Sequence, residues 1–429
     1  MLGLVLGGGG AKGSYQIGVW KALKELDIPI DLVVGTSIGS LNAAFVAQGD
    51  YEKALTMWNT FDAGKMFDIE GYDKLDTNEK LLASMHIFAK DFIHEGGIEA
   101  TEYKKAIQKF VDEKKVRASS IQFGLVTYDL SNQKPVEIPL SEIKTGQLTD
   151  YIMASSAIIP AVKPYEIDGV KYIDGGFYDV VPMNLALVMG ATELIAVDLS
   201  AVGVVKKTDH PENIGRLRYI KPYWDLGSVL IFEDRVVQRN IALGYFDTLK
   251  SFGAYDGRAY TFIKEKTDKH IETRMREILG AQTETMSLKK SRFSLADSIT
   301  ESKWKSLSKE HTTVNGKKLS DLLLCVEIVA EMLKIDPTKI YTLESMNHKI
   351  RQKLSSITLD TERKNAKSIL TKLTNDLSTI ADEGARLKYF AREIQKSLKA
   401  GDDFRIQKLA PVFTKEFFGG LYIAVCDLL

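Results

Sequence analysis

Short apolar runs alternate with amphipathic segments from the beginning of the chain. Residues 2–6 and 31–35 are apolar runs of strand length, and helical spacing of apolar positions follows at 14–26, 38–48 and 51–60. This alternation predicts a layered α/β fold with a largely parallel sheet. Further strands are expected at residues 121–128, 170–173 and 194–199.

Two other stretches of this half are less regular. Residues 131–135, Ser-Asn-Gln-Lys-Pro, predict a turn that joins two extended segments. Residues 61–100 carry aromatic and Met side chains among polar ones, with no clear single period. They could cover a pocket, but we expect ordinary helices packed on the sheet, because such side chains are mostly core.

The pattern changes after about residue 265, where long charged segments with helical spacing replace the strands. Apolar positions in residues 318–333 form one stripe, and residues 343–354 and 366–398 continue in the same style. We therefore expect two domains, residues 1–265 and a helical region at 266–429. The apolar stretch at 409–429 is interrupted by charges, which favours core packing over membrane docking.

Composition narrows the function classes. Among the 429 residues, 57 basic and 57 acidic side chains balance, and we find no nucleic-acid motif, so no nucleic-acid partner is expected. Cys325 and Cys426 lie far apart without metal-ligand spacing, which predicts neither a disulfide nor a metal site. No run of 18 apolar residues and no signal-like start appear, so we expect a cytoplasmic protein that makes transient contact with a membrane surface.

Gly35-Thr36-Ser37-Ile38-Gly39 follows the second apolar run and opens a helical pattern. A strand that turns sharply into a helix at a glycine-flanked serine is typical of a nucleophile elbow, in which the turn exposes the hydroxyl. Ser37 is therefore our candidate nucleophile. The pentapeptide alone could also be an ordinary loop, so its neighbours must decide.

A glycine run, residues 7–13, connects the first strand to the first helix. Such a run presents backbone amides at a helix N-terminus and forms an anion cradle. Gly8, Gly10 and Gly13 also match a dinucleotide fingerprint, which expects an acidic residue after the second strand. The serine elbow occupies that place, so we favour an oxyanion hole beside Ser37.

A serine nucleophile needs a base. None of the six histidines lies in a small-residue turn of the kind that usually presents a catalytic imidazole. Asp174-Gly175-Gly176 instead places a carboxylate at the end of a predicted strand, and the glycines allow another group to approach closely. Asp174 is the better candidate.

Together with the supporting run at residues 154–160, these motifs resemble those of the patatin-like phospholipases. The resemblance covers about residues 1–265 and implies a three-layer α/β/α fold that hydrolyses lipid acyl esters with a Ser–Asp dyad, without histidine or cofactor. It implies Ser37 as nucleophile, Asp174 as general base and the amides of Gly8, Gly9 and Gly10 as oxyanion hole. Supporting motif positions would be Lys12, Gly13, Gly35, Gly39, Gly175 and Gly176.

Three positions depart from the family pattern. Family members often have Asp where Gly7 stands, Arg where Lys12 stands and Asn where Val180 stands. Lys12 keeps the charge but loses the planar fork of arginine, which weakens any bidentate role in holding the loop or a lipid phosphate. None of these changes removes a predicted catalytic atom.

The sequence thus predicts a serine lipid acyl hydrolase of the phospholipase A or lysophospholipase type. Two alternatives stay open: an acyltransferase that uses the same acyl-enzyme, and a non-catalytic lipid-binding or interaction protein. Head-group and chain preference, sn-1 against sn-2 attack, the role of residues 266–429 and the oligomeric state are not predicted.

Overall fold

The computed structural model describes residues 1–60, 100–264, 295–312, 318–359, 382–400 and 410–429, together with positions 271 and 273. The chain divides into two compact units, Met1–Phe252 and Gly253–Leu429. The change of pattern in the sequence had suggested a division after residue 265. The expectation of helices or a cover at residues 61–100 falls almost wholly outside the described residues.

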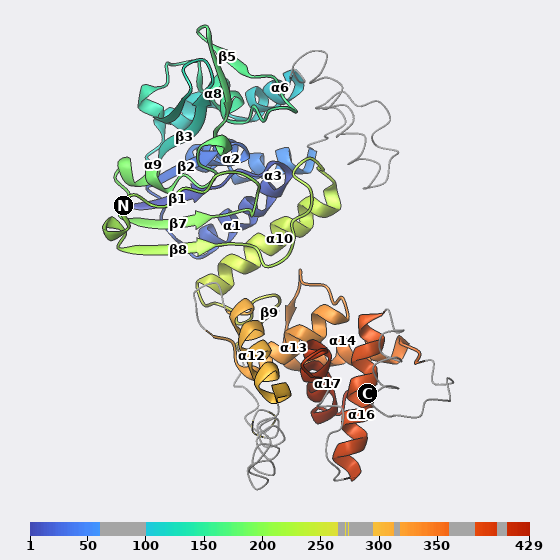
Figure 1. Cartoon of the computed structure of the whole chain (residues 1–429). Helices are drawn as coiled ribbons and strands as arrows, with labels where there is room; N and C mark the ends of the chain where they lie inside the picture. The colour runs from blue at the N-terminus through green and yellow to red at the C-terminus, as the bar shows by residue number, and fades with distance from the viewer. Residues whose placement is uncertain are drawn as a thin grey trace. The chain divides into compact units, whose positions relative to one another are not determined.

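The first unit is built on an eight-stranded sheet. Strands β3, β2, β1, β7 and β8 are parallel neighbours in this order, and Figure 1 shows them stacked in that sequence. The antiparallel β6 and β5 extend the sheet beyond β3, and β4 also pairs with β3. The strands are β1 Leu2–Leu6, β2 Leu32–Thr36, β3 Gln122–Asp129, β4 Lys134–Pro139, β5 Tyr165–Ile167, β6 Val170–Asp174, β7 Glu193–Val197 and β8 Arg216–Ile220. The predicted parallel sheet is confirmed, and the turn predicted at residues 131–135 overlaps the β3–β4 connection.

Both faces of the central parallel strands are covered by helices, which explains why β1 and β2 are almost wholly buried and carry no charged side chain. Helix α9 packs on the face that carries Val5, Val34 and Val126. Helix α2 contacts the same strands, and the alternation of side chains along a strand assigns it the other face. The helices of this unit are α1 Ser14–Glu25, α2 Ile38–Gln48, α3 Tyr51–Thr60, α6 Thr101–Phe110, α7 Glu113–Ala118, α8 Leu148–Ser155, α9 Met183–Val188 and α10 Asp234–Ser251.

Helix α10 was not predicted from the sequence, although it packs extensively against α1. Two glycines allow the close approach. A Cβ at Gly18 would overlap the carbonyl of Ile241, and one at Gly244 would overlap the carbonyl of Tyr15. The tertiary contact therefore depends on the absence of two side chains.

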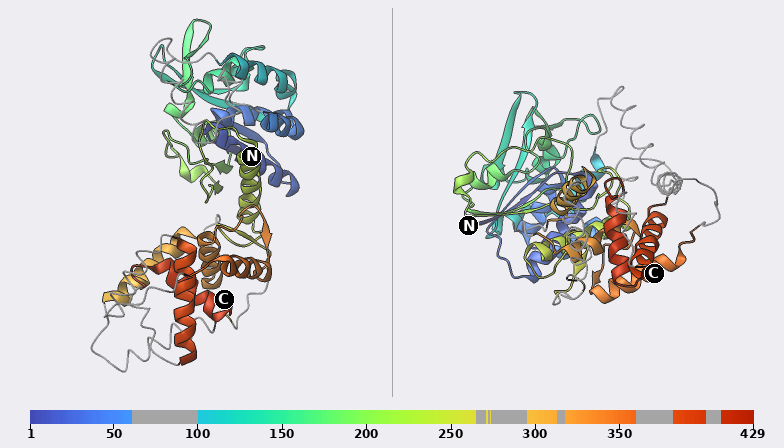
Figure 2. Two further views of the ribbon diagram at one scale, coloured as in Figure 1. Left: turned by 90° about the vertical axis from the view of Figure 1, so that its right-hand side faces the viewer. Right: turned by 60° about the horizontal axis from the view of Figure 1, so that its bottom comes forward.

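Helices dominate the second unit, as the sequence predicted. They are α12 Leu295–Glu310, α13 Asp321–Met332, α14 Leu343–Ser356, α16 Glu383–Ala400 and α17 Thr414–Val425, with a two-residue parallel pair of β9 Thr261–Phe262 and β10 Ile340–Tyr341. Helices α16 and α17 lie side by side in Figure 1 and Figure 2. Phe417, Leu421 and Ile423 of α17 are buried, which agrees with core packing of the last segment. None of the described helices is long and apolar enough to cross a membrane.

Candidate active site

Ser37 lies at the turn between β2 and α2. Its backbone has φ 56° and ψ −129°, a conformation that is costly for a residue with a Cβ. The flanking residues must be glycines because backbone carbonyls lie against both of them. A Cβ at Gly35 would overlap the Gly39 carbonyl, and one at Gly39 would overlap the Leu6 carbonyl. The sharp turn leaves the Ser37 side chain at the carboxyl edge of the parallel strands.

Ser155, the last residue of α8, ties the backbone of this turn to the neighbouring strand β3. Its hydroxyl accepts a hydrogen bond from the Ser37 amide at 2.8 Å and donates one to the Val126 carbonyl of β3 at 2.7 Å. Ser155 is fully buried. On the other side, Ser40 donates both its hydroxyl and its amide to the Ser37 carbonyl, at 2.6 and 2.8 Å. Sequence reasoning placed Ser155 in a supporting run but assigned it no role.

Asp174 ends strand β6 and faces Ser37. Asp174 is 5% exposed, and its carboxylate accepts the Gly176 amide at 2.7 Å. Burial raises the pKa of Asp174 to about 6, although the nearby Ser37 side chain and the Gly176 amide each act to lower it. A Cβ at Gly175 would overlap the Val126 carbonyl, so this glycine allows β6 to turn here.

The glycine run forms the wall next to Ser37. The Gly8 amide donates to the Val180 carbonyl at 3.0 Å, and a Cβ at Gly8 would lie 3.2 Å from the Ser37 Cβ. Within the described part of the chain, the amides of Gly9 and Gly10 have no hydrogen-bond partner. Of the three predicted donors, these two are therefore the ones available to an incoming anion. The lack of a side chain at Gly8 instead lets the glycine run pass close to Ser37.

The remaining motif positions support this wall. The Lys12 ammonium donates to the Ser200 carbonyl at 3.4 Å, and Lys12 does not line the cavity described next. A Cβ at Gly13 would lie 2.8 Å from Ile38, so this glycine lets the run pack against the first turn of α2. A Cβ at Gly176 would lie 3.0 Å from the Asp174 carboxylate.

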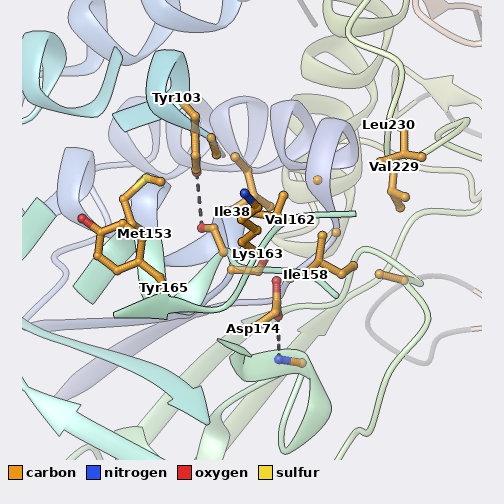
Figure 3. A pocket seen from close by; sticks show the side chains of 18 of the residues that line it. Ile38, Tyr103, Met153, Ile158, Val162, Lys163, Tyr165, Asp174, Val229 and Leu230 are labelled. Atoms are coloured by element: carbon orange, nitrogen blue, oxygen red, sulfur yellow. Dashed lines mark hydrogen bonds between the residues drawn. The ribbon is translucent and has the colours of Figure 1, made fainter. Parts of the chain in front are cut away.

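A cavity of about 440 Å³ opens in front of Ser37, Asp174 and Gly8 to Gly10. Figure 3 shows the side chains that line it, including Ile38, Met153, Ile158, Val162 and Leu230. Its walls are mainly apolar. On one side the Tyr103 hydroxyl lies 3.3 Å from the Ser156 hydroxyl, and the Lys104 ammonium donates to Asp150 at 2.9 Å. The motifs in the sequence include Ile38, Ser156 and Ile158. The other lining residues, which are distant along the chain, were not singled out: Tyr103, Lys104, Met153, Val162 and Leu230.

Metal and histidine chemistry find no support in the part of the chain that the structure covers. There, no three His, Cys, Asp or Glu side chains are arranged to hold a metal ion. His311, in the second unit, is buried and contacts the Leu307 carbonyl and the Glu331 carboxylate. None of the described histidines lines the cavity.

The fold and the site define an α/β protein with a serine elbow facing a buried carboxylate at the carboxyl edge of a parallel sheet. Residues 4–187 match the model of the Patatin family, described as patatin-like phospholipase. Residues 4–187 are thus a patatin-like phospholipase domain, and the resemblance drawn from the motifs is confirmed for this part of the chain.

Curated relatives are similar to the same half of the chain. The lysophospholipase NTE1 of Mycosarcoma maydis is 32% identical over 203 residues, which is 47% of this chain and 10% of the relative. The lysophospholipase NTE1 of Yarrowia lipolytica is 30% identical over 203 residues, with 13% of its length covered. The matched part is thus about a tenth of these much longer relatives.

Two solved structures are similar across nearly the whole chain. VipD from Legionella pneumophila has 13% sequence identity and a TM-score of 0.38, with 99% of this chain and 91% of that chain covered. The type III effector ExoU has 12% identity and a TM-score of 0.29, with 99% and 88% covered.

Proposed function

We propose that this protein is a serine lipid acyl hydrolase of the phospholipase A or lysophospholipase type. The observation that carries the proposal is that Ser37, held in a strained turn, and the buried Asp174 carboxylate line the same apolar cavity, with the Ser37 side chain near enough to lower the Asp174 pKa. Perturbed carboxylates and strained residues gather at active sites more often than elsewhere. The patatin-like domain supports the same class of chemistry.

In the first half of the reaction, the Ser37 oxygen attacks the ester carbonyl while Asp174 takes the hydroxyl proton. The Gly9 and Gly10 amides are the donors that we assign to the developing oxyanion, because they have no other partner within the described residues. Gly8 lines the same wall, but its amide is already engaged with Val180. Collapse of the tetrahedral intermediate releases the alcohol, which takes the proton from Asp174, and leaves an acyl-enzyme on Ser37.

In the second half, water attacks the acyl-enzyme with Asp174 again acting as base, and the fatty acid leaves. The raised pKa of Asp174 suits this role, because a carboxylate with a pKa of about 6 is a stronger base than an exposed one and is still ionised at neutral pH. No cofactor is needed at any step.

The substrate that fits best is a lipid ester with its acyl chain in the apolar cavity. A volume of about 440 Å³ with mostly apolar walls suits a hydrocarbon chain better than a polar ligand. The curated relatives are named lysophospholipases, which makes a lysophospholipid the first substrate to try. Such lipids are presented at membrane surfaces, so transient surface contact belongs to this proposal.

The test compares wild type, Ser37→Ala and Asp174→Asn on a panel of phospholipids, lysophospholipids and neutral lipids, with products identified by mass spectrometry. We expect free fatty acid from wild type and a loss on the order of 10³-fold or more in Ser37→Ala. Ser156→Ala is a matched control, since Ser156 lines the same cavity but contacts Tyr103. Undiminished hydrolysis in a folded Ser37→Ala protein would exclude the mechanism.

The same panel separates the alternative reactions. An acyltransferase would transfer the acyl group to an added lysolipid or alcohol and release little fatty acid. A non-catalytic lipid-binding protein would retain lipid in wild type and in Ser37→Ala without forming any product.

A further inference from the structure

We propose that a surface at the mouth of the cavity docks onto an anionic phospholipid bilayer. This surface, the mouth patch, consists of exposed apolar side chains. Val202 is fully exposed, and the other four are between 43% and 48% exposed: Ile158, Phe177, Val204 and Val205. The inference rests on the proposed function, because the bilayer would be the source of the lipid ester.

Two members of the patch, Ile158 and Val202, line the same cavity as Asp174. The Asp174 amide donates to the carbonyl of Ala157, the residue before Ile158, at 2.9 Å, and Figure 3 labels both Ile158 and Asp174 on the cavity wall. The Val204 amide donates to the Gly176 carbonyl at 3.1 Å, and Phe177 follows Gly176 directly. A lipid that leaves a bilayer held against this patch would therefore enter the cavity without crossing water.

Backbone hydrogen bonds hold the valine segment in place and leave its side chains outside. The Val204 carbonyl accepts the Val180 amide at 2.6 Å, and the Lys206 amide donates to the Asp179 carboxylate at 3.2 Å. A Cβ at Gly203 would overlap the Val180 side chain, so the segment lies directly against the protein. Exposed apolar clusters that are fixed in this way mark interaction surfaces.

Charge selects the kind of partner. Residues 201–207 read Ala-Val-Gly-Val-Val-Lys-Lys, with two cations and no acid, although the chain as a whole has no net charge. The Lys206 ammonium lies 3.4 Å from the centre of the Tyr178 ring, and Lys207 is exposed. The carboxylates that act on the Lys206 ammonium are Glu137, which is half-buried, and Asp179, which is buried; Asp209 follows two residues after Lys207.

Apolar side chains flanked by lysines match an anionic bilayer, in which the former enter the acyl boundary and the latter meet the head groups. A second copy of this chain is a poorer partner for a symmetric contact, because it would bring these lysines against one another. We therefore commit to the bilayer.

The experiment measures vesicle binding with Ser37→Ala protein, so that the lipid is not consumed. The vesicles are equal parts phosphatidylcholine and phosphatidylglycerol, or phosphatidylcholine alone. In this background, Val202→Ser with Val205→Ser should lower binding to the mixed vesicles by about tenfold or more. Lys206→Gln with Lys207→Gln should lower binding to mixed vesicles by roughly tenfold while leaving the weaker binding to phosphatidylcholine unchanged.

Val188→Ser is the matched control for Val202→Ser. Val188, the last residue of α9, is 83% exposed. It lies near the amino edge of the sheet, opposite the cavity, because the amide of residue 192 donates a hydrogen bond to the Met1 carbonyl there. Val188→Ser should bind like its parent, and circular dichroism would check that every variant is folded.

Two results would overturn the proposal. One is equal binding, or no binding, by the parent and the Val202→Ser protein. The other is a parent that sediments as a dimer and becomes a monomer in the Val202→Ser, Val205→Ser variant, which would make the patch an interface between copies. Ester cleavage by wild type on a monomeric ester is measured separately, so failure of docking and failure of the proposed function remain distinguishable.

Discussion

Two buried carboxylates, one in each unit, lie in contrasting surroundings. Asp174 borders a cavity, accepts the Gly176 amide and lies close enough to the Ser37 side chain for that side chain to lower its pKa. Glu327 of α13 is fully buried and its Oε1 accepts the backbone amides of Arg258 and Tyr260, at 2.7 and 3.1 Å. Burial is thus common to both, and the difference lies in what each carboxylate faces.

The comparison separates the carboxylate that we propose as general base from a structural one. Glu327 holds two amides of an adjoining segment, so its removal would leave buried donors unpaired. Asp174 is held at some cost in stability, because its burial disfavours the charged form that a general base needs. Five predictions test this contrast, beginning with the two carboxylates themselves and then running from the larger to the smaller expected effect.

Asp174→Asn should lower kcat on the order of 10²–10⁴-fold, because it removes the general base. The same change should raise the free energy of unfolding at neutral pH by up to about 3 kcal/mol, since a pKa raised by burial marks an ionised form that destabilises the fold. Ester hydrolysis and urea denaturation measure the two effects.

Glu327→Gln is the counterpart of that change. It should lower the free energy of unfolding by roughly 1–3 kcal/mol, because it weakens buried hydrogen bonds, and leave kcat of the folded protein unchanged. The contrast fails if Glu327→Gln removes activity, or if Asp174→Asn destabilises the fold and leaves kcat intact.

Gly10→Ala should lower kcat by on the order of 10²–10³-fold. Gly10 has φ 55°, and a Cβ there would overlap the Val229 carbonyl, so the loop and its oxyanion donors must shift. Gly49→Ala is the matched control, because Gly49 has φ 74° but nothing within 4 Å of an added Cβ. Steady-state kinetics of both variants would show whether the loss comes from the cavity wall; equal losses would argue against it.

Ser155→Ala should lower kcat by on the order of 10–10²-fold with little change in KM. It removes the acceptor of the Ser37 amide and frees the strained turn to move relative to Asp174. Ser156→Ala removes a neighbouring hydroxyl that contacts only the cavity wall at Tyr103, and should cost less. A Ser155→Ala protein with unchanged kcat would show that the turn needs no support from β3.

The dependence of activity on pH should follow Asp174. A general base must be ionised, so kcat/KM should fall about tenfold for each pH unit below about 6. Stability should change in the opposite sense: the free energy of unfolding contributed by this group falls as the pH rises from 3.8, the usual value, to about 6. A pH profile on a monomeric ester, with Asp174→Asn as reference, measures the first effect.

Much of the fold was predictable from short-range patterns. The apolar runs of β1 and β2 and the stripe of α13 carry strand and helix periodicity within single segments. Helix α10 was missed, because what places it is contact with α1 through Gly18 and Gly244 rather than its own pattern. The mouth patch was missed for the same reason, since the sequence of a valine-rich segment does not show whether other parts of the fold bury its side chains.

The sequence by itself determined the chemistry that the chain carries: a serine in a glycine-flanked turn, a glycine run before a helix and an aspartate before two glycines. These depend on backbone geometry that only certain local residues permit. The tertiary structure alone decided which groups meet. In the folded chain the Gly8 amide donates to the Val180 carbonyl and the Ser37 amide donates to the Ser155 hydroxyl. Asp174 is buried enough for its pKa to rise. Those outcomes depend on contacts between residues far apart in the chain, which no local pattern encodes.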